Sequence, residues 1–233
     1  MKIALTGKGG VGKTTITACL SRYYADKGFN VLAVDADPDA NLGLALGMSE
    51  EMIDSITPIS EMKDLAEERT NAKKGTYGAF FTMNPEVADI PEKFCREFNG
   101  VKLLTMGTVD TGGGGWVFPE HVLLKMLTTH LVLYQKDIVI MDMEAGIEHL
   151  GRGTASAVDA FIVVVEPGIR SIQTFKRISK LAGDIGVKHV YAIGNKIRKP
   201  EDIDFLNERI GAENIFGFLD YSDQISGSDR NNK

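Results

Sequence analysis

Short apolar runs rich in β-branched residues recur along the chain, and segments with helical spacing separate most of them. Each run is apolar at nearly every position, which is typical of strands that a parallel sheet buries on both faces. The runs cover residues 3–6, 31–35, 101–106, 138–142, 161–165, 190–193 and 215–219. The alternation predicts an α/β fold: a doubly wound, mostly parallel sheet with helices on both faces.

The first predicted helix covers residues 13–27. The spacing of Ile16, Leu20, Tyr23 and Tyr24 predicts one apolar face for packing against the sheet. Gly28 follows at the position where glycine commonly ends a helix.

Three further segments are a predicted helix start near residue 119, a charged stretch and a polar tail. Pro119 and Glu120 are typical of a helix start, because proline suits the first turn and glutamate complements the helix dipole. The charged stretch of about 48–97 has weaker periodicity, and we interpret it as a helical insertion after the second strand. About 222–233 is a polar tail without an apolar face. We therefore expect one phosphate-loop domain over residues 1–233.

Net charge, cysteine positions and the length of apolar runs indicate which partners and which compartment to expect. The 233 residues are 43% hydrophobic and carry a formal charge of −6, so nucleic acid is not expected to be the principal partner. Cys19 and Cys95 lie far apart and outside any metal-binding spacing, which favours a reducing compartment. The chain begins with a strand pattern and has no apolar run of about 20 residues, so we expect a cytoplasmic protein with no membrane partner.

Residues 7–14 read Gly-Lys-Gly-Gly-Val-Gly-Lys-Thr and match the phosphate-loop motif between a predicted strand and a predicted helix. Glycines let backbone N–H groups turn toward phosphate oxygens, Lys13 supplies a compact charge, and the Thr14 hydroxyl suits Mg²⁺. A glycine-rich turn with a chance lysine is the alternative, which the complete motif in this context disfavours. The expected contacts to Mg–ATP are Gly9, Gly10, Val11, Gly12, Lys13, Thr14 and Thr15.

Acidic residues follow two of the predicted strands. The second strand ends in Asp35, Asp37 and Asp39, and the period of two places the first two on one face. A carboxylate there could orient water against the γ-phosphate; the alternative is a surface turn rich in Asp and Pro. The fourth strand ends in Asp142, which is typical of a residue that holds Mg²⁺ through water. Gly146 then suits a second switch whose backbone senses the γ-phosphate.

Asn195 and Lys196 follow the sixth predicted strand. An asparagine amide offers both a donor and an acceptor, which suits the edge of a nucleotide base. The alternative is an ordinary turn asparagine.

The loop form Lys-Gly-Gly-x-Gly-Lys-Thr-Thr at residues 8–15 resembles the MinD/ParA/nitrogenase iron protein superfamily. The resemblance implies that Lys8 reaches the partner's phosphates across an ATP-bound homodimer, as an arginine finger does. It also implies that Asp37 orients the attacking water and that Asn195 contacts adenine.

A closer resemblance rests on several short strings in order along the chain. They lie at residues 7–15, 35–39, 56–58, 61–63, 141–143, 145–150, 152–155, 166–167 and 195–196. Together they resemble the accessory ATPases of carbon monoxide dehydrogenase maturation, the CooC type. This resemblance implies slow, dimer-coupled hydrolysis of ATP to ADP and phosphate. It also implies a client nickel enzyme, such as carbon monoxide dehydrogenase, that receives nickel.

The chain departs from that family at its metal motif. The family usually carries Cys-x-Cys after a glycine-rich loop, whereas Trp116 and Phe118 stand at the cysteine positions here. Neither side chain binds nickel or zinc, which prefer thiolate or imidazole ligands. We interpret His121 and His130 as ordinary surface or packing residues.

Two further sites concern acidic residues and a histidine near the predicted nucleotide site. Glu144, Glu148 and His149 are interpreted as hydrogen-bonding groups of the switch, with a hard-metal ligand set as the alternative. Asp220 replaces a proline that the family often carries near the adenine.

Three other functions remain open from the sequence. A paralogue could keep the ATPase and act as a metal-independent regulator. A positioning or partitioning ATPase like MinD or ParA would need an amphipathic membrane helix or a basic DNA surface. An iron–sulfur electron donor would need cysteines at the dimer interface, where neither Cys19 nor Cys95 is expected.

Overall fold

A computed structural model describes residues 1–72, 82–107, 119–144 and 158–225. These residues contain a single eight-stranded sheet with the order β3-β4-β2-β5-β1-β6-β7-β8. The strands are β1 Lys2–Gly7, β2 Val31–Ala36, β3 Arg96–Phe98, β4 Val101–Thr105, β5 Ile138–Met143, β6 Ala160–Val165, β7 Val190–Ile197 and β8 Ile215–Asp220. Neighbouring strands are parallel except for the β3–β4 pair. The predicted α/β fold is confirmed.

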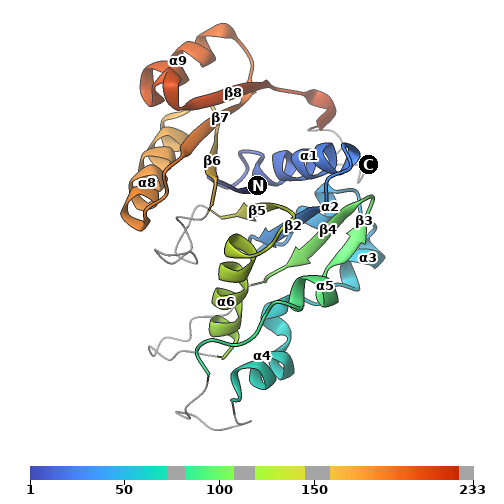
Figure 1. The fold of residues 1–233 in the computed structure, drawn as a ribbon. Helices are drawn as coiled ribbons and strands as arrows, with labels where there is room; N and C mark the ends of the chain where they lie inside the picture. Colours follow the sequence, from blue (N-terminus) through green and yellow to red (C-terminus); the bar gives the residue numbers. More distant parts are fainter. Residues whose placement is uncertain (73–81, 108–118, 145–157, 226–233) are drawn as a thin grey trace.

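Helices cover both faces of the sheet (Figure 1). They are α1 Lys13–Asp26, α2 Leu42–Ala45, α3 Glu50–Asp54, α4 Lys63–Thr70, α5 Ile90–Phe94, α6 Pro119–Leu133, α8 Ile169–Ile185 and α9 Pro200–Ile210. The short 3₁₀ turns are η1 Ile59–Glu61 and η2 Ala212–Asn214. Successive side chains of a strand point to opposite faces of the sheet, which divides the core into two layers. Leu5 packs with α1 and α2 on one face, whereas Ala4 packs with α6 and α8 on the other.

The buried face of α1 agrees with the prediction at Ile16, which is buried, and at Leu20 and Tyr24, which pack against the core, but Tyr23 is exposed. The helix also buries Ala18 and the small polar residues Thr17 and Ser21. The Thr17 and Ser21 hydroxyls donate to carbonyls one turn earlier, at 3.0 and 2.8 Å, so no hydroxyl donor is left unpaired there. Small residues allow the helix to lie close to the sheet. Apolar spacing alone does not predict this arrangement.

The described residues of the charged stretch contain α3, η1, α4 and α5, and at its end lies the antiparallel strand β3, which the sequence pattern did not predict. This edge strand is only three residues long and reads Arg-Glu-Phe. Such a short charged run carries no apolar periodicity. Tertiary pairing with β4 creates the strand.

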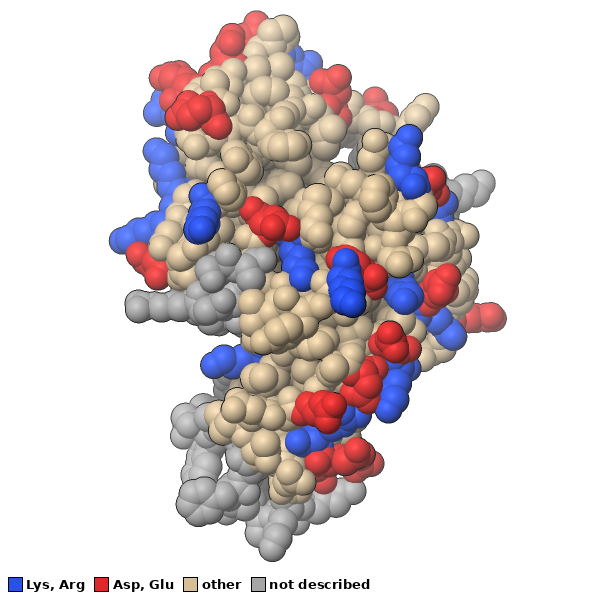
Figure 2. Space-filling view, viewed as in Figure 1, with Lys and Arg blue, Asp and Glu red and all other residues tan. Residues whose placement is uncertain are grey.

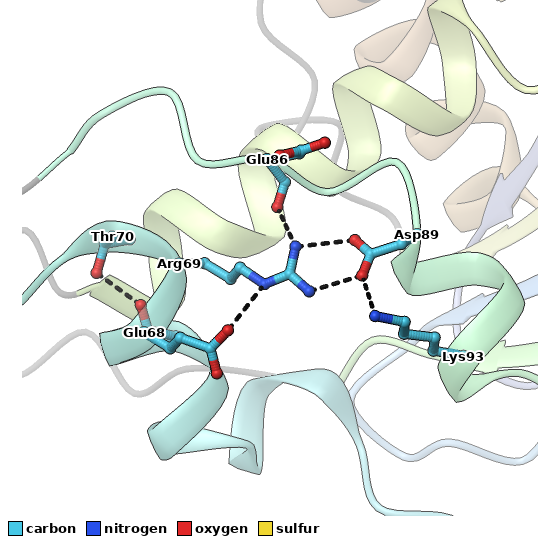
Figure 3. Close-up of polar contacts among 7 residues, drawn as sticks. Glu68, Arg69, Thr70, Glu86, Asp89 and Lys93 are labelled. Carbon is cyan, nitrogen blue, oxygen red and sulfur yellow. Dashed lines mark hydrogen bonds and ion pairs between the residues drawn. The ribbon is translucent and has the colours of Figure 1, made fainter.

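An ion-pair network joins α4 to the start of α5 (Figure 3). The Arg69 guanidinium donates to both carboxylate oxygens of Asp89, at 2.8 and 2.7 Å, and also to the Glu86 carbonyl oxygen at 3.0 Å. Lys93 Nζ lies 2.8 Å from the same carboxylate, and Glu68 lies 3.8 Å from Arg69 Nε. The fork geometry fixes the two helical segments relative to each other.

Candidate functional site

The register of the central strands brings the predicted motifs together. Asp142 at the end of β5 is paired with Asp35 on β2 and with Leu5 on β1. Because these strands are parallel, their carboxyl ends lie at one edge of the sheet, where α/β proteins bind ligands. The phosphate-loop motif begins two residues after Leu5, at Gly7. The first loop and both acidic clusters therefore share one site.

Glycine is required at two positions of the loop. A Cβ at Gly7, whose φ is +150°, would lie 2.5 Å from the Val164 carbonyl oxygen. Gly12 precedes α1 with φ of +97°, and a Cβ there would lie 2.5 Å from the Asn195 side-chain nitrogen. Side chains at either point would push the loop away from its neighbours. The predicted residues Gly9 and Gly10 are exposed, as a loop that wraps a ligand requires.

Lys13 and Asp37 form a partly buried ion pair. The Lys13 ammonium lies 3.6 Å from an Asp37 carboxylate oxygen, with side-chain exposures of 7% and 16%. Thr14 and Thr15 follow on the first turn of α1 and are half-buried. The two charged groups predicted to act on the γ-phosphate are thus adjacent in the folded chain.

Asp35 and Asp39 occupy different positions from Asp37. Asp35 is buried, and its carboxylate accepts the backbone N–H groups of Leu42 at 2.9 Å and Asp37 at 3.3 Å. Burial raises the pKa of Asp35 to about 7, opposed by these hydrogen bonds. Asp39 is exposed and donates its N–H to Asp37 at 3.2 Å. The Asp35 carboxylate therefore ties the end of β2 to the turn that carries Asp37 and to the start of α2.

Asp142 is the least satisfied polar group of the site. Both carboxylate oxygens are buried, and neither has a hydrogen-bond partner within the described ranges. Burial raises the pKa of Asp142 to about 6, opposed by the nearby Thr14 hydroxyl and the Lys13 charge. A buried carboxylate without a partner is costly, but it suits a hard cation or its bound water. These residues fit Mg²⁺: Thr14 would be a direct ligand and Asp142 would hold a bound water.

The end of β7 differs from the sequence prediction. Asn195 and Lys196 lie within the strand, at a register irregularity against β8, and Lys196 adopts φ of +60°. The Asn195 amide donates to the Val11 carbonyl at 2.8 Å, and the Lys196 ammonium donates to the Gly10 carbonyl at 2.6 Å. Both side chains therefore brace the phosphate loop. An irregularity of this kind has no apolar-periodicity signal.

Two connections at the site were not predicted. The Thr6 hydroxyl donates to the Glu144 carbonyl at 2.7 Å, which ties β1 to the segment after Asp142. Lys8 lies at the start of the loop with its ammonium 3.9 Å from Glu166. Glu166 and Pro167 directly follow an apolar strand, and this position at a strand end was the sequence signal that could have placed Glu166 at the site.

A hollow of about 530 Å³ lies beside the ends of β7 and β8. Arg198, Asp220 and Tyr221 are among its lining residues. The Arg198 guanidinium carbon lies 3.5 Å from the centroid of the Tyr221 ring, which is a stacked cation–π geometry. Because β7 and β8 are parallel to β1, this hollow opens at the edge that carries the phosphate loop.

Several predicted residues lie outside the described ranges. They are Gly146 of the second switch, Trp116 and Phe118 of the departing metal motif, and Glu148 and His149. In the part of the chain that the structure describes, no group of three or more His, Cys, Asp or Glu side chains could hold a metal ion. Within the same part, no helix is both long and apolar enough to cross a membrane.

Comparison with known proteins identifies the family. Residues 2–233 match the model of the CobQ/CobB/MinD/ParA nucleotide binding domain. The carbon monoxide dehydrogenase accessory protein CooC of Rhodospirillum rubrum is 48% identical over 230 residues, which cover 99% of this chain and 87% of that relative. The chain belongs to the CooC branch of this family. An uncharacterised ATP-binding protein of Methanocaldococcus jannaschii is 45% identical to this CooC-type chain over 232 residues, covering 98% and 88%.

Solved structures of more distant proteins share the fold of the CooC-type chain. MinD of Aquifex aeolicus matches with a TM-score of 0.65 at 20% identity, covering 100% of this chain and 88% of that one. A ParA family ATPase from Chlorobium tepidum matches with a TM-score of 0.64 at 17% identity, covering 97% and 86%. The fold is thus common to proteins with different roles.

Proposed function

We propose that this CooC-type protein binds Mg–ATP, hydrolyses it slowly as a homodimer, and serves as an accessory ATPase in the maturation of a nickel enzyme such as carbon monoxide dehydrogenase. The observation that carries the ATPase part is the convergence of buried Lys13, Asp37 and unpaired Asp142 beside the glycine loop. The likeness to the Rhodospirillum rubrum accessory protein supports the client.

Each residue has a physical task in this proposal. Backbone N–H groups of the loop bind phosphate oxygens, and Lys13 neutralises their charge. Thr14 and Asp142 hold Mg²⁺, which when bound neutralises further phosphate charge. Asp37 orients water once phosphate has replaced it beside Lys13. Lys8 acts across the dimer on the partner's phosphates.

The base is assigned to the hollow beside β7 and β8. Its stacked Arg198 and Tyr221 offer flat faces for a purine, and Asp220 adds an acceptor at the rim. Asn195 already uses one amide hydrogen on Val11. Among the described residues its second hydrogen and its oxygen have no other partner, and we infer that they contact adenine, as the family resemblance implies.

Nickel is a cargo in this scheme. Trp116 and Phe118 replace the thiolate pair of the family, so this chain contributes no cysteine ligands there. We infer that the ATPase motor is kept and that the thiolate metal site lies elsewhere, either on the client or on a further accessory protein.

The other functions receive less support. On the face in Figure 2, Lys and Arg side chains are interspersed with Asp and Glu, which is unlike the continuous basic surface that a DNA-partitioning ATPase needs. Cys19 is exposed on α1, and Cys95 is half-buried after α5 in the insertion. This placement gives no reason to expect a shared iron–sulfur cluster.

The proposed function is tested with the purified chain and nickel-free carbon monoxide dehydrogenase. We expect magnesium-dependent ATP hydrolysis, binding to the nickel-free client, and faster recovery of client activity when nickel and ATP are present together. Lys13→Ala is the control and should support none of these. ATP hydrolysis without any binding to the client would retain the ATPase and reject the maturation role.

A further inference from the structure

Three neighbouring strands each present a charged side chain just beyond or at their carboxyl ends. The register pairs Gly7 on β1 with Val164 on β6, and Val165 on β6 with Gly194 on β7. The residues that follow are Lys8, Glu166 and the Asn195–Lys196 pair. Strand pairing therefore forces a carboxylate to lie between two lysines of the nucleotide site, although these residues are far apart in sequence.

The observed distances agree with this register. One Glu166 carboxylate oxygen lies 3.9 Å from the Lys8 ammonium, and the other lies 3.9 Å from the Lys196 ammonium. All three side chains are between one-third and two-fifths exposed. Both ion pairs are long and partly exposed to solvent, so each is weak and exchangeable.

The three residues are not held equally. The Glu166 backbone N–H donates to the Ser171 hydroxyl at the start of α8, at 3.4 Å. Lys196 has a second contact, its 2.6 Å hydrogen bond to the Gly10 carbonyl. The Lys8 ammonium is held, among the described residues, by Glu166 alone. Lys8 is consequently the member that can leave at least cost.

We propose that Glu166 is a positioning residue that retains Lys8 on its own subunit until a partner's triphosphate competes for it. This inference rests on the proposed role of Lys8 across the dimer. A triphosphate offers more negative charge and more oxygens than one carboxylate, so it takes the lysine. After release, Glu166 still has Lys196 as a counter-charge, so no unpaired carboxylate is left beside the phosphates. The contact thus competes with the dimer for Lys8 and weakens ATP-dependent dimerisation.

Glu166→Gln tests the proposal, because it removes the charge and keeps the side-chain shape. ATP-dependent dimerisation is measured by sedimentation velocity as a function of protein concentration. We expect the variant to dimerise about tenfold more tightly, from about threefold for each of the two lysines released in a symmetric dimer. Glu208→Gln, an exposed glutamate on α9, is the matched control and should not change the dimer constant.

The Lys8→Ala background distinguishes a positioning role from a structural one. With Lys8 absent, Glu166→Gln should no longer tighten the dimer. An equal effect with and without Lys8, or no effect in the natural background, would overturn the proposal. Should Glu166→Gln melt below the natural chain, Glu166→Asp gives the same comparison, because a shorter side chain also withdraws the carboxylate from Lys8.

Failure of the proposed role of Lys8 across the dimer would give a different result in the same dimerisation measurements. If Lys8→Ala alone dimerises with ATP as tightly as the natural chain, then Lys8 does not act across the interface. That outcome rejects the trans role and the retention of Lys8 together. A weaker Lys8→Ala dimer combined with a Glu166→Gln effect that persists in both backgrounds rejects the role of Glu166 alone.

Discussion

The ammonium of Lys13 lies 3.6 Å from the carboxylate of Asp37, and both side chains are largely shielded from water. The pair places the charge that neutralises phosphate directly beside the group proposed to orient water. A triphosphate that enters the loop must replace Asp37 as the partner of Lys13. Binding would therefore free the carboxylate for the attacking water, which couples occupancy of the loop to the first switch segment.

Asp37→Ala should separate binding from hydrolysis. Loss of the water-orienting carboxylate is expected to slow single-turnover hydrolysis by about 100-fold or more. ATP should still bind, because Asp37 no longer competes for Lys13, and an ATP-bound dimer should accumulate on gel filtration. Hydrolysis at the natural rate would show that another residue orients the water.

Lys13→Ala should remove nucleotide binding. The lost charge-assisted contacts, about 3 kcal/mol, correspond to at least about 100-fold in Kd. Titration with a fluorescent ADP analogue measures this, with Lys188→Ala on the surface as the control. Binding of the analogue by Lys13→Ala with natural affinity would contradict the assignment of the phosphate loop.

Asn195→Ala tests the bracing of the loop by β7. The Asn195 amide bond to the Val11 carbonyl is expected to contribute about 1 kcal/mol, so the Kd for ADP should rise about fivefold. The affinities for ADP and GDP should fall together if bracing is its main role. A selective loss for adenine nucleotides would instead assign Asn195 to the base.

Asp142→Asn should affect stability and ligand binding in opposite directions. Neutralising a buried carboxylate that lacks a partner among the described residues should stabilise the nucleotide-free protein by about 1 kcal/mol, which raises Tm by about 3 °C. The same change should remove the gain in ATP affinity that Mg²⁺ provides. Calorimetric melting and ATP titrations with and without magnesium measure both effects. A lower Tm for the magnesium-free variant would indicate that Asp142 has a stabilising partner.

The Arg69–Asp89 ion pair should make the free energy of unfolding depend on pH. Hydrogen bonds from Arg69 and Lys93 hold the pKa of Asp89 well below its ordinary value. A lowered pKa stabilises the fold above the unfolded pKa of about 4, and this contribution is lost as the pH falls through the folded pKa.

Asp89→Asn should therefore cost about 1 kcal/mol at pH 7, a modest figure because the pair is partly exposed. Urea unfolding at several pH values measures the cost, which should diminish between about pH 5 and pH 2. Asp204→Asn, at an exposed position on α9, is the control. A cost that stays constant with pH would mean that the Asp89 charge is not responsible.

Sequence patterns predicted the elements better than the contacts between them. Seven apolar runs appear as parallel strands, and the phosphate loop lies between β1 and α1 as its motif indicates. The prediction for α1 was wrong in one respect, since Tyr23 is exposed while Thr17 and Ser21 are buried. Helical spacing identifies a face, but close approach to a sheet selects small residues for it.

The sequence by itself determined the strand–helix alternation, the glycine loop and the acidic ends of two strands, because each depends on residues close together in the chain. Tertiary structure decided what these residues contact. It placed Asn195 and Lys196 against the loop, gave Asp35 two backbone N–H groups, and set Glu166 between two lysines. Those relationships depend on the order and register of strands that are distant in sequence, and local patterns of apolar and polar residues do not encode either one.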